Sequence, residues 1–584
     1  MDRNSAIGLT LMALLLLGYF YFFSPSPEAQ KDKTATAKIV VKDTTQQKTE
    51  TALDSNLVKQ YGDLGSLLTG KEEFTSVEND VLKLTFSNTG TLNEVNLKNY
   101  KTYSQQPLFL AKDGNNKFSL VAMYNGQDVD LYQLHYPAEI VKQTDTTKVI
   151  FTANLSATSF IKHIYSIPNK GYKIGYKIES KGITLGKDLA FAWVDYVPLV
   201  EKDLTTTRNK TTVNYYTSQG SFKNLSETSP DNKTFEEPTQ WVSIQQKFFL
   251  SAIFAEKNFS AGSASTFFNK TDSAFVKKTE VNLSVAANTN LAYYFGPNDH
   301  RITEKIAEEF SRNEYIGWPP VIWVNKFLTR PIFEFLQTFI TNYGLVILLL
   351  VLVMKLILTP LIYSSYLGMA KMRLLKPELD IIKEKNGDNM AQAQQDQMQL
   401  YRQVGVNPFS GCIPVLLQMP ILFSLFYLFP NSIDLRQHSF LWAEDLSTYD
   451  SIINLPFAIP FYGSHVSLFV LLMTASQIIY AWQQNQMTTV DGPMKMMGYI
   501  TPLVFLFMFN SFSSGLSFYY FVSNLITFAQ QAIIKRFVDE DKIKAIMDEN
   551  KKKAATGTGK KSKFMSRLEE AMKANEEIKK KGKK

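Results

Sequence analysis

Residues 346–363, V-I-L-L-L-V-L-V-M-K-L-I-L-T-P-L-I-Y, decide the fold class of this chain. With residues 343–345 the apolar run reaches 21 residues, close to the roughly 20 that a bilayer-spanning helix needs. At a rise of about 1.5 Å per residue, Lys355 lies about 16 Å from Gly344 and about 12 Å from Tyr363. A lysine near mid-membrane costs roughly 2.5–3.5 kcal/mol on insertion scales. The stretch therefore predicts a membrane-spanning helix with a charge that serves a function.

Composition separates this chain from most enzyme classes. The mean hydropathy is −0.12 although 45% of the 584 residues are hydrophobic, so the apolar residues are gathered into blocks. The one cysteine, Cys412, excludes an internal disulfide framework. The five histidines have no ligand spacing, and no nucleotide-binding loop, zinc motif or nucleophile elbow is present. We therefore expect no metal, no cofactor and no enzymatic activity.

The first half of the chain divides into three parts. Residues 1–23 are predicted to be an N-terminal transmembrane anchor, because the apolar run is longer than a typical signal-peptide core and no A-x-A-like site follows. A cleaved signal peptide is the alternative. Residues 24–55 have the composition of a flexible linker. Residues 56–317 contain short segments of period 2, which predict an all-β sandwich on one side of the membrane; these segments are 81–87, 148–155, 172–180 and 279–285.

The second half predicts a helical membrane domain. Residues 318–342 place Lys326, Arg330 and Glu334 four residues apart among aromatic residues, as in an interfacial amphipathic helix; a buried soluble helix is the alternative. Five spans follow and, with the anchor, make six transmembrane helices; the five are 343–363, 412–429, 466–482, 496–510 and 514–534.

The distribution of basic residues predicts the orientation of the chain. Residues 364–411 are rich in Lys and Arg, and the tail 535–584 has 17 Lys and Arg against 9 Asp and Glu, which accounts for the whole net charge of +8. The positive-inside rule places both segments in the cytoplasm, together with residues 483–495. Both termini are then cytoplasmic, and residues 24–342 are periplasmic.

Polar residues within the spans predict a hydrated groove around Lys355. Ser517, Asn524, Thr527 and Gln531 share one face of the last span. Other spans add further polar residues: Thr359, Gln418, Ser424 and Gln477. In lipid such groups face the bundle interior or a water-filled cavity, although tight hydrogen bonding between helices is the alternative for any one of them. No Asp or Glu lies within the five spans, so water, hydroxyls, amides, lipid headgroups or an arriving group must meet the charge of Lys355.

The cytoplasmic segment 364–411 is predicted to be a helical hairpin with its turn at 386–388. Its first arm carries apolar residues at helical spacing: Met369, Met372, Leu375, Leu379 and Ile382. A methionine-bearing face suits transient contact with varied apolar segments. Packing of the two arms against each other is the alternative, and both can hold.

Four motifs carry a resemblance to a known family. N-P-F-S-G-C-I-P-V-L-L-Q-M-P-I (407–421) is the longest; M-A-K-M-R-L-L-K-P-E-L (369–379), S-S-G-L-S-F-Y-Y-F-V-S-N-L (513–525) and Y-F-G-P (294–297) follow the same family order. Over nearly its whole length the chain resembles the bacterial YidC membrane protein insertases. The resemblance implies a periplasmic β-super-sandwich and a five-helix insertase core, residues 343–534, with a positively charged hydrophilic groove.

The resemblance also implies function and partners. Members insert, fold and help assemble inner-membrane proteins, alone or with the Sec translocon, and they act as chaperones. The hairpin would receive nascent membrane proteins, and the basic tail would contact the ribosome or anionic lipids. Better-known members carry arginine where Lys355 stands; lysine keeps the charge but loses the planar fork of five donors.

Two other functions remain open at this point. A small-solute secondary transporter could use Lys355 as an anion site, but it should show inverted repeats, and the sequence has none that we can detect. A membrane-anchored periplasmic carbohydrate-active enzyme would leave Lys355 and the hairpin without a role.

Overall fold

The computed structural model describes residues 57, 61–269, 271–387, 389–407, 413–487 and 493–556. The expected anchor and linker, residues 408–412 of the 407–421 motif and the last part of the tail lie outside these residues. The chain divides into two compact units, split between Tyr315 and Ile316, with Asn431–Ile433 belonging to the first. The two units are described separately.

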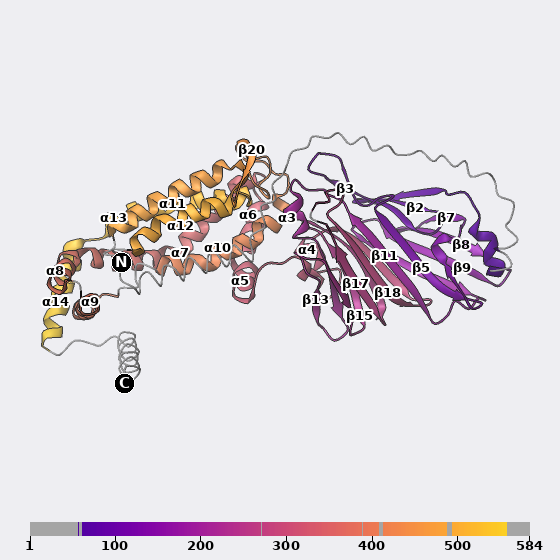
Figure 1. Ribbon diagram of the computed structural model, residues 1–584, viewed down its shortest axis with the longest axis horizontal. Coiled ribbons are helices and arrows are strands. Elements are labelled where there is room, and N and C mark those ends of the chain that lie inside the picture. Colours follow the sequence, from indigo (N-terminus) through magenta and orange to yellow (C-terminus); the bar gives the residue numbers. More distant parts are fainter. Residues whose placement is uncertain are drawn as a thin grey trace. The chain divides into compact units, whose positions relative to one another are not determined.

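The first unit is built almost entirely of strands (Figure 1). A four-stranded sheet has the order β1-β2-β3-β4, formed by Phe74–Glu78, Leu82–Ser87, Leu92–Lys101 and Pro107–Ala111. A six-stranded sheet has the order β14-β17-β18-β11-β5-β6, formed by Asp231–Thr234, Gly262–Phe267, Lys277–Ala286, Asp188–Val197, Asn116–Tyr124 and Gln127–Asp130. A nine-stranded sheet has the order β13-β12-β15-β16-β19-β10-β9-β8-β7, formed by Phe222–Asn224, Thr212–Thr217, Thr239–Gln245, Phe249–Phe259, Asn290–Pro297, Lys173–Lys181, Phe160–Pro168, Thr146–Asn154 and Ala138–Lys142.

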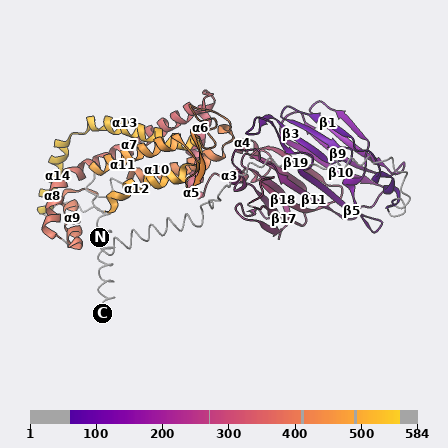
Figure 2. The same ribbon diagram turned by 45° about the horizontal axis from the view of Figure 1, so that its top comes forward.

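The expected β-sandwich is present, as two layers around one core (Figure 2). Phe86 of the four-stranded sheet and Phe118 of the six-stranded sheet contact Tyr165 and Tyr293, with ring centroids 4.6 and 6.3 Å apart. Both tyrosines project from the same face of the nine-stranded sheet, because each is linked to Tyr176 by ring contacts across the strands. The two smaller sheets therefore share one face of the large sheet. The segments expected as strands from period 2 form β2, β8, β10 and β18.

Short helices precede, connect or follow these strands. They are η1 (Gly62–Leu68), η2 (Leu131–Gln133), α3 (Leu204–Arg208), α4 (His300–Thr303) and η3 (Phe310–Asn313).

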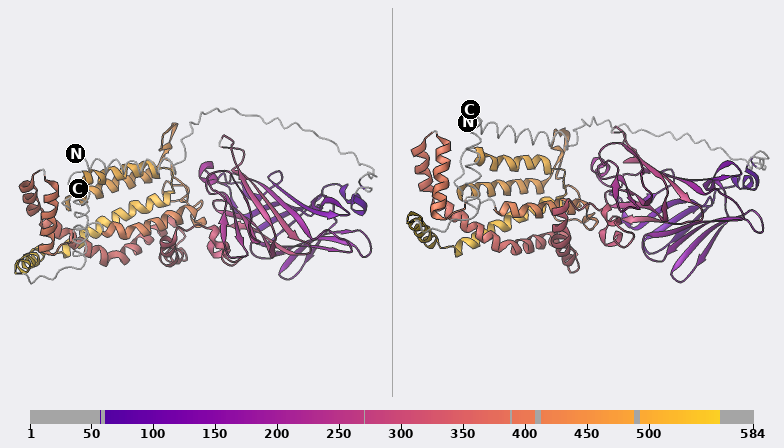
Figure 3. Two further views of the ribbon diagram at one scale, coloured as in Figure 1. Left: turned by 60° about the horizontal axis from the view of Figure 1, so that its bottom comes forward. Right: turned by 90° about the horizontal axis from the view of Figure 1, so that it is seen from below.

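The second unit is a helical bundle, in which Figure 3 shows the long helices side by side. Its long helices are α7 (Tyr343–Leu374), α10 (Ile413–Asn431, whose last residue is assigned to the first unit), α11 (Leu468–Met487), α12 (Pro493–Phe509) and α13 (Ser514–Phe537). The five spans expected from the sequence are thus helices. Among the described residues, α7 alone is long and apolar enough to cross a membrane, judged by helix length and composition. Met496–Phe509 is a shorter apolar helix.

The segment before α7 carries an exposed aromatic stripe. It consists of α5 (Pro319–Val324), the π-helical turn η4 (Asn325–Thr329) and α6 (Arg330–Gln337). Four exposed aromatic side chains recur every four or eight residues, namely Trp323, Phe327, Phe335 and Phe339. Arg330 and Glu334 form an ion pair of 3.5 Å beside this stripe. This pattern is the one expected of an interfacial amphipathic helix.

The helical hairpin differs in extent from the expectation. We expected it to start at 364, but α7 continues without a break to Leu374, since no proline lies between Tyr363 and Leu374 and the helix accommodates Gly368. Its arms are α8 (Lys376–Asn386), with Pro377 in the first turn, and α9 (Met390–Val404). The turn lies where expected, with Gly387 at φ +49.

Two further elements were not expected. A β-hairpin formed by β20 (Ile453–Ile459) and β21 (Gly463–Val466) follows the short turn η6 (Ile433–Leu435). The segment we expected to be only a basic tail begins with the end of α13 and continues as α14 (Glu540–Ala555).

Candidate functional site

Lys355 faces the inside of the helical bundle. The side-chain oxygen of Asn342 accepts from the backbone N–H of Leu345 and caps the start of α7. On this helix Leu356 is 61% exposed, whereas Lys355 is 7% exposed. The turn of the helix therefore places an apolar side chain outward and the charged one inward at the same depth.

Two other helices supply the partners of the Lys355 ammonium. Its Nζ donates to Gln418 Oε1 of α10 at 3.3 Å and to Thr527 Oγ1 of α13 at 2.9 Å. Gln418 in turn donates from Nε2 to the Tyr519 hydroxyl at 2.9 Å. An ammonium has three N–H donors, and within the described residues Lys355 has these two side-chain acceptors. The polar cluster thus joins α7, α10 and α13.

A second layer of hydrogen bonds lies one turn further along α7. Thr359 Oγ1 donates to the Lys355 carbonyl at 2.8 Å. Gln530 Nε2 donates to the same carbonyl at 3.1 Å and to Thr359 Oγ1 at 3.0 Å. These bonds hold the α7 backbone at Lys355 against α13. The lysine is therefore held both at its backbone carbonyl and at its side-chain ammonium. We call Lys355, Thr359, Gln418, Tyr519, Thr527 and Gln530 the Lys355 cluster.

The charge in the cluster has only neutral acceptors. No carboxylate of the described residues lies within ion-pair distance of Lys355, as the composition of the spans predicted. A buried charge without a counter-charge is costly. The arrangement can therefore attract an anionic group without first having to break an internal ion pair.

Other residues predicted for the groove make contacts of their own. Asn524 Nδ2 donates to Ser476 Oγ at 2.8 Å and so joins α13 to α11. The side-chain carbonyl oxygens of Gln477 and Gln531 are buried and have no hydrogen-bond partner among the described residues. These two oxygens are further acceptors inside the bundle.

Ser424 and Ser517, which we predicted to line the groove, make no hydrogen bond to the Lys355 cluster among the described residues. Ser517 lies in the first turn of α13, ten residues or about 15 Å along the helix from Thr527, and its hydroxyl bonds to the Ser513 carbonyl. Ser424 is fully buried, and its hydroxyl oxygen lies 2.6 Å from Asn325 Oδ1 and 2.7 Å from Thr329 Oγ1. Its single O–H donates to one of these oxygens, and its lone pairs can accept from the Thr329 hydroxyl. Ser424 fastens α10 to the π-helical turn η4.

Removing the Ser424 hydroxyl should destabilise this end of the bundle. In Ser424→Ala the oxygens of Asn325 and Thr329 lose a buried partner, which we expect to cost about 2–3 kcal/mol. Ser517→Ala is the matched control, because its hydroxyl bonds only within its own helix at 3.5 Å. Unfolding in mixed SDS micelles measures both variants. Equal stability of the two would contradict this role of Ser424.

Tyr519 was missed by the sequence reasoning. It is one of several aromatic residues in 513–525 and has no sequence signal that separates it from core aromatics. Its hydroxyl orients Gln418 so that Oε1 faces Lys355.

The predicted client face of the hairpin is covered in this structure. Met372, Leu375 and Leu379 are buried and Ile382 is partly buried in one cluster with α9 and α14, whereas Met369 packs with Tyr366 and Ile534. From α14 the cluster receives Ile543 and Met547. The arrangement is the one expected if these residues join the arms, with α14 as an additional cover.

Polar contacts hold α14 in place. Arg373 pairs with Glu540, Lys551 lies 2.8 Å from Glu378, and Asn550 Nδ2 donates to the Val404 carbonyl at 3.3 Å. The spacing of Ile543 and Met547, four residues apart, was the sequence signal for a packed helix. We predicted only a basic tail for residues 535–584, so this packed helix was not expected.

Ile543→Asp should release α14 from the hairpin. A charge placed in this apolar cluster without a partner costs several kcal/mol, so α14 should leave and backbone amides of α9 should exchange hydrogen at least tenfold faster. Hydrogen exchange with mass spectrometry reads this directly. Ile546→Asp is the control, since Ile546 is exposed; equal exchange in the two variants would refute the docking.

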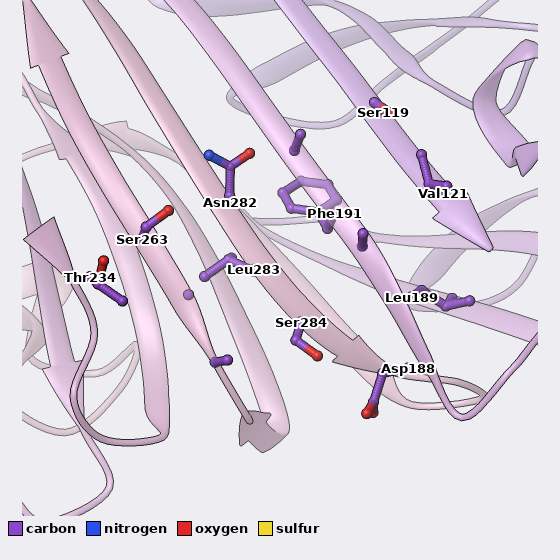
Figure 4. A pocket seen from close by; sticks show the side chains of 14 residues that line it. Ser119, Val121, Asp188, Leu189, Phe191, Thr234, Ser263, Asn282, Leu283 and Ser284 are labelled. Atoms are coloured by element: carbon purple, nitrogen blue, oxygen red, sulfur yellow. The ribbon is translucent and has the colours of Figure 1, made fainter. Parts of the chain in front are cut away.

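The first unit has a separate pocket on its six-stranded sheet (Figure 4). Its volume is about 520 Å³, and its lining includes small side chains of β5, β11, β17 and β18, such as Ser119, Ala190, Ser263 and Ser284. Asp188 is the one carboxylate in that lining. Most glycosidases act through a pair of carboxylates, which this pocket does not present.

Comparison with known proteins covers both units. The family described as "YidC periplasmic domain" matches residues 75–335, and the family described as "60Kd inner membrane protein" matches residues 335–542. The protein named membrane protein insertase YidC of Amoebophilus asiaticus is 43% identical over 98% of this chain and 99% of its own length. That of Cytophaga hutchinsonii is 43% identical over 99% of this chain and 98% of its own.

A solved structure of an active YidC insertase covers 79% of this chain and 92% of its own, at 20% identity and a TM-score of 0.33. The assignment rests on the full-length sequence relatives. With a β-rich domain matching the periplasmic model and a helical C-terminal region matching the membrane model, this chain belongs to the YidC family of membrane protein insertases.

Proposed function

We propose that this insertase receives the hydrophilic flank of its client at the Lys355 cluster. One observation carries the proposal: a buried ammonium on α7 is met by neutral acceptors from α10 and α13 and by no carboxylate of the described residues. An acidic or polar flank can bind there by charge attraction. Thr359, Gln418 and Thr527, with the more distant Asn524, Gln477 and Gln531, then supply hydrogen bonds along a hydrophilic groove.

We further propose the order of events. A nascent apolar segment meets the cytoplasmic hairpin, and its short flank enters the bundle toward Lys355. The flank needs to cross only part of the bilayer, and the apolar segment then moves into lipid along α10 and α12. Burial of about 20 apolar residues in lipid is itself favourable, so the step needs no nucleotide.

The proposal includes a topology of six transmembrane helices in the bacterial inner membrane. Residues 1–23 form the anchor, 24–55 the linker, 56–317 the periplasmic β domain, 318–342 the interfacial helix and 343–534 the core, followed by the tail 535–584. Both termini are cytoplasmic and residues 24–342 are periplasmic. The excess of Lys and Arg in the hairpin and tail supports this orientation.

Partners follow from the same reasoning. Nascent membrane proteins are the clients, and the Sec translocon shares the work for larger ones, where the chain also acts as a chaperone. The basic tail binds the phosphate groups of ribosomal RNA or anionic lipids. Lysine at 355 acts as a point charge, so it attracts a carboxylate without the two-pronged geometry of arginine.

Purified protein in liposomes tests the proposal. A short single-span client with an acidic N-terminal flank should become protease-protected in these liposomes well above the level in empty ones. The same client with a basic flank is the matched control and should insert less. Insertion no better than in empty liposomes would reject insertion by this chain alone and favour Sec-dependent action.

A further inference from the structure

The hairpin of β20 and β21 exposes apolar side chains at one end of the helical bundle. Ile453, Phe457 and Phe461 are all exposed, the last two by 62% and 58%. The hairpin belongs to the loop between α10 and α11. Large exposed apolar side chains gathered in this way on one hairpin indicate a binding surface.

The surrounding sequence has no charge that would keep this surface in water. From Ser451 to Val490 the chain contains no Asp, Glu, Lys or Arg. Natural edge strands that face water are usually protected by charged residues, especially lysine. The composition of this hairpin is therefore that of a surface which faces an apolar phase.

Hydrogen bonds hold the turn, the second strand and the flanking segments of the hairpin to the bundle. Asn510, after the end of α12, donates from Nδ2 to the carbonyls of Tyr462 and His465, at 2.9 and 2.8 Å. The buried Asp450 accepts from the backbone N–H groups of Leu468 and Phe469 at the start of α11, at 2.9 and 3.1 Å. The exposed side chains thus project from a held element.

The hairpin continues the exposed apolar face of α12. Four exposed residues of α12 share one helix face, namely Met496, Ile500, Leu503 and Phe507. Tyr462, at the tip of the hairpin, packs on the last of them with ring centroids 5.7 Å apart. A face of α12 that contacts lipid would therefore lead directly onto the hairpin.

We propose that the β20–β21 hairpin inserts into the outer leaflet and that its partner is the bilayer at the boundary of headgroups and acyl chains. This inference rests on the proposed placement of the bundle in the membrane. The exposed aromatic stripe of α5 and α6 supports placing the hairpin at the membrane interface. The reason is that α6 packs at the start of α7, the same end of the bundle at which α10 and α12 end.

The hydrogen-bonding groups of the backbone limit how deeply the hairpin can enter the bilayer. A two-stranded hairpin leaves N–H and C=O groups on both edges, and these cannot be left without partners in hydrocarbon. The hairpin must therefore stay in the hydrated interface with its side chains directed to the acyl chains. Pro456 and Pro460 lack the N–H that a further strand would need, which argues against a protein partner that adds a strand. The hairpin would fix the depth of the neighbouring α12.

Fluorescent labels on single cysteines test this inference in the full-length protein. In a Cys412→Ser background, NBD is attached at Phe457→Cys or Ile453→Cys, and the protein is reconstituted in phosphatidylcholine and phosphatidylglycerol vesicles. Some of the lipids carry a nitroxide at a shallow or a deep acyl position. Leu503→Cys on α12 reports the placement of the bundle, and Met123→Cys, 60% exposed in the β domain, reports water.

We expect at least twofold quenching at Phe457→Cys and Ile453→Cys, stronger from the shallow nitroxide than from the deep one, and none at Met123→Cys. Quenching at Leu503→Cys without quenching at the hairpin would overturn the inference and leave the proposed function intact. No quenching at Leu503→Cys either would reject the placement of the bundle. Unquenched labels at the hairpin, together with a disulfide between two copies of the unlabelled Phe457→Cys variant under oxidation, would assign the surface to self-association instead.

Discussion

Lys355→Glu should reduce insertion of a client with an acidic flank at least tenfold. The substitution replaces attraction by repulsion at the cluster, and two unit charges about 4 Å apart interact by about 4 kcal/mol at an effective dielectric constant of 20. A tenfold loss needs only about 1.4 kcal/mol. Protease protection of the client in liposomes containing the purified variant measures the effect.

Three controls separate charge from folding. Lys355→Arg should keep most activity because it keeps the charge, and Lys355→Gln should lie between the natural protein and Lys355→Glu. A client with a basic flank should insert better with Lys355→Glu than the acidic client does. If all variants insert both clients alike, the charge of Lys355 has no part in receiving the client.

Asp195→Asn should stabilise the β domain by about 4 kcal/mol at pH 7. Asp195 of β11 is fully buried, and neither carboxyl oxygen has a hydrogen-bond partner among the described residues. Burial raises the pKa of this carboxyl from 3.8 to about 8, and the nearby Asn116 amide shifts this pKa in the opposite direction. Since one pKa unit corresponds to about 1.4 kcal/mol, holding the group near neutrality costs several kcal/mol that the amide avoids.

The pH dependence has a defined sign. The folded state holds a proton on Asp195 that the unfolded state releases above pH 3.8, so stability is highest below that pH and falls as the pH rises to about 8. Asp195→Asn should remove this slope. Hydrogen exchange of β11 and β18 amides at several pH values measures it in the whole chain. Asp188→Asn, exposed on the same strand, is the control; a natural protein without the slope, or a destabilised Asp195→Asn, would contradict the account.

The sequence was sufficient to predict the elements with strong periodicity. Period 2 located β2, β8, β10 and β18, and apolar runs located α7 and α10–α13. The sequence also limited the partners of Lys355 to water, hydroxyls, amides, lipid headgroups or an arriving group, because the spans contain no carboxylate. The structure shows one amide and one hydroxyl among them, those of Gln418 and Thr527. Membrane placement of the helices stays a prediction.

Periodicity did not predict which residues on one helix face lie close to each other along the helix axis. Ser517 shares a face with Thr527, but helical spacing defines a direction and not a neighbour, so its distance along α13 excluded it from the cluster. Ser424 lies outside the cluster for a related reason. Its partners Asn325 and Thr329 lie in a π-helical turn that no sequence pattern predicted. Charged neighbours concealed the apolar pair of α14 that packs on the hairpin.

Photocrosslinking from inside the bundle tests most directly whether the Lys355 cluster receives the client flank. A photoreactive amino acid at Gln418 would be compared with one at Leu356, which lies next to Lys355 on α7 but faces outward with 61% exposure. During insertion Gln418 should capture the acidic flank, and Leu356 should capture lipid or the apolar segment. Capture of the flank by Leu356 and not by Gln418 would show that the flank passes outside the cluster, which would contradict the account.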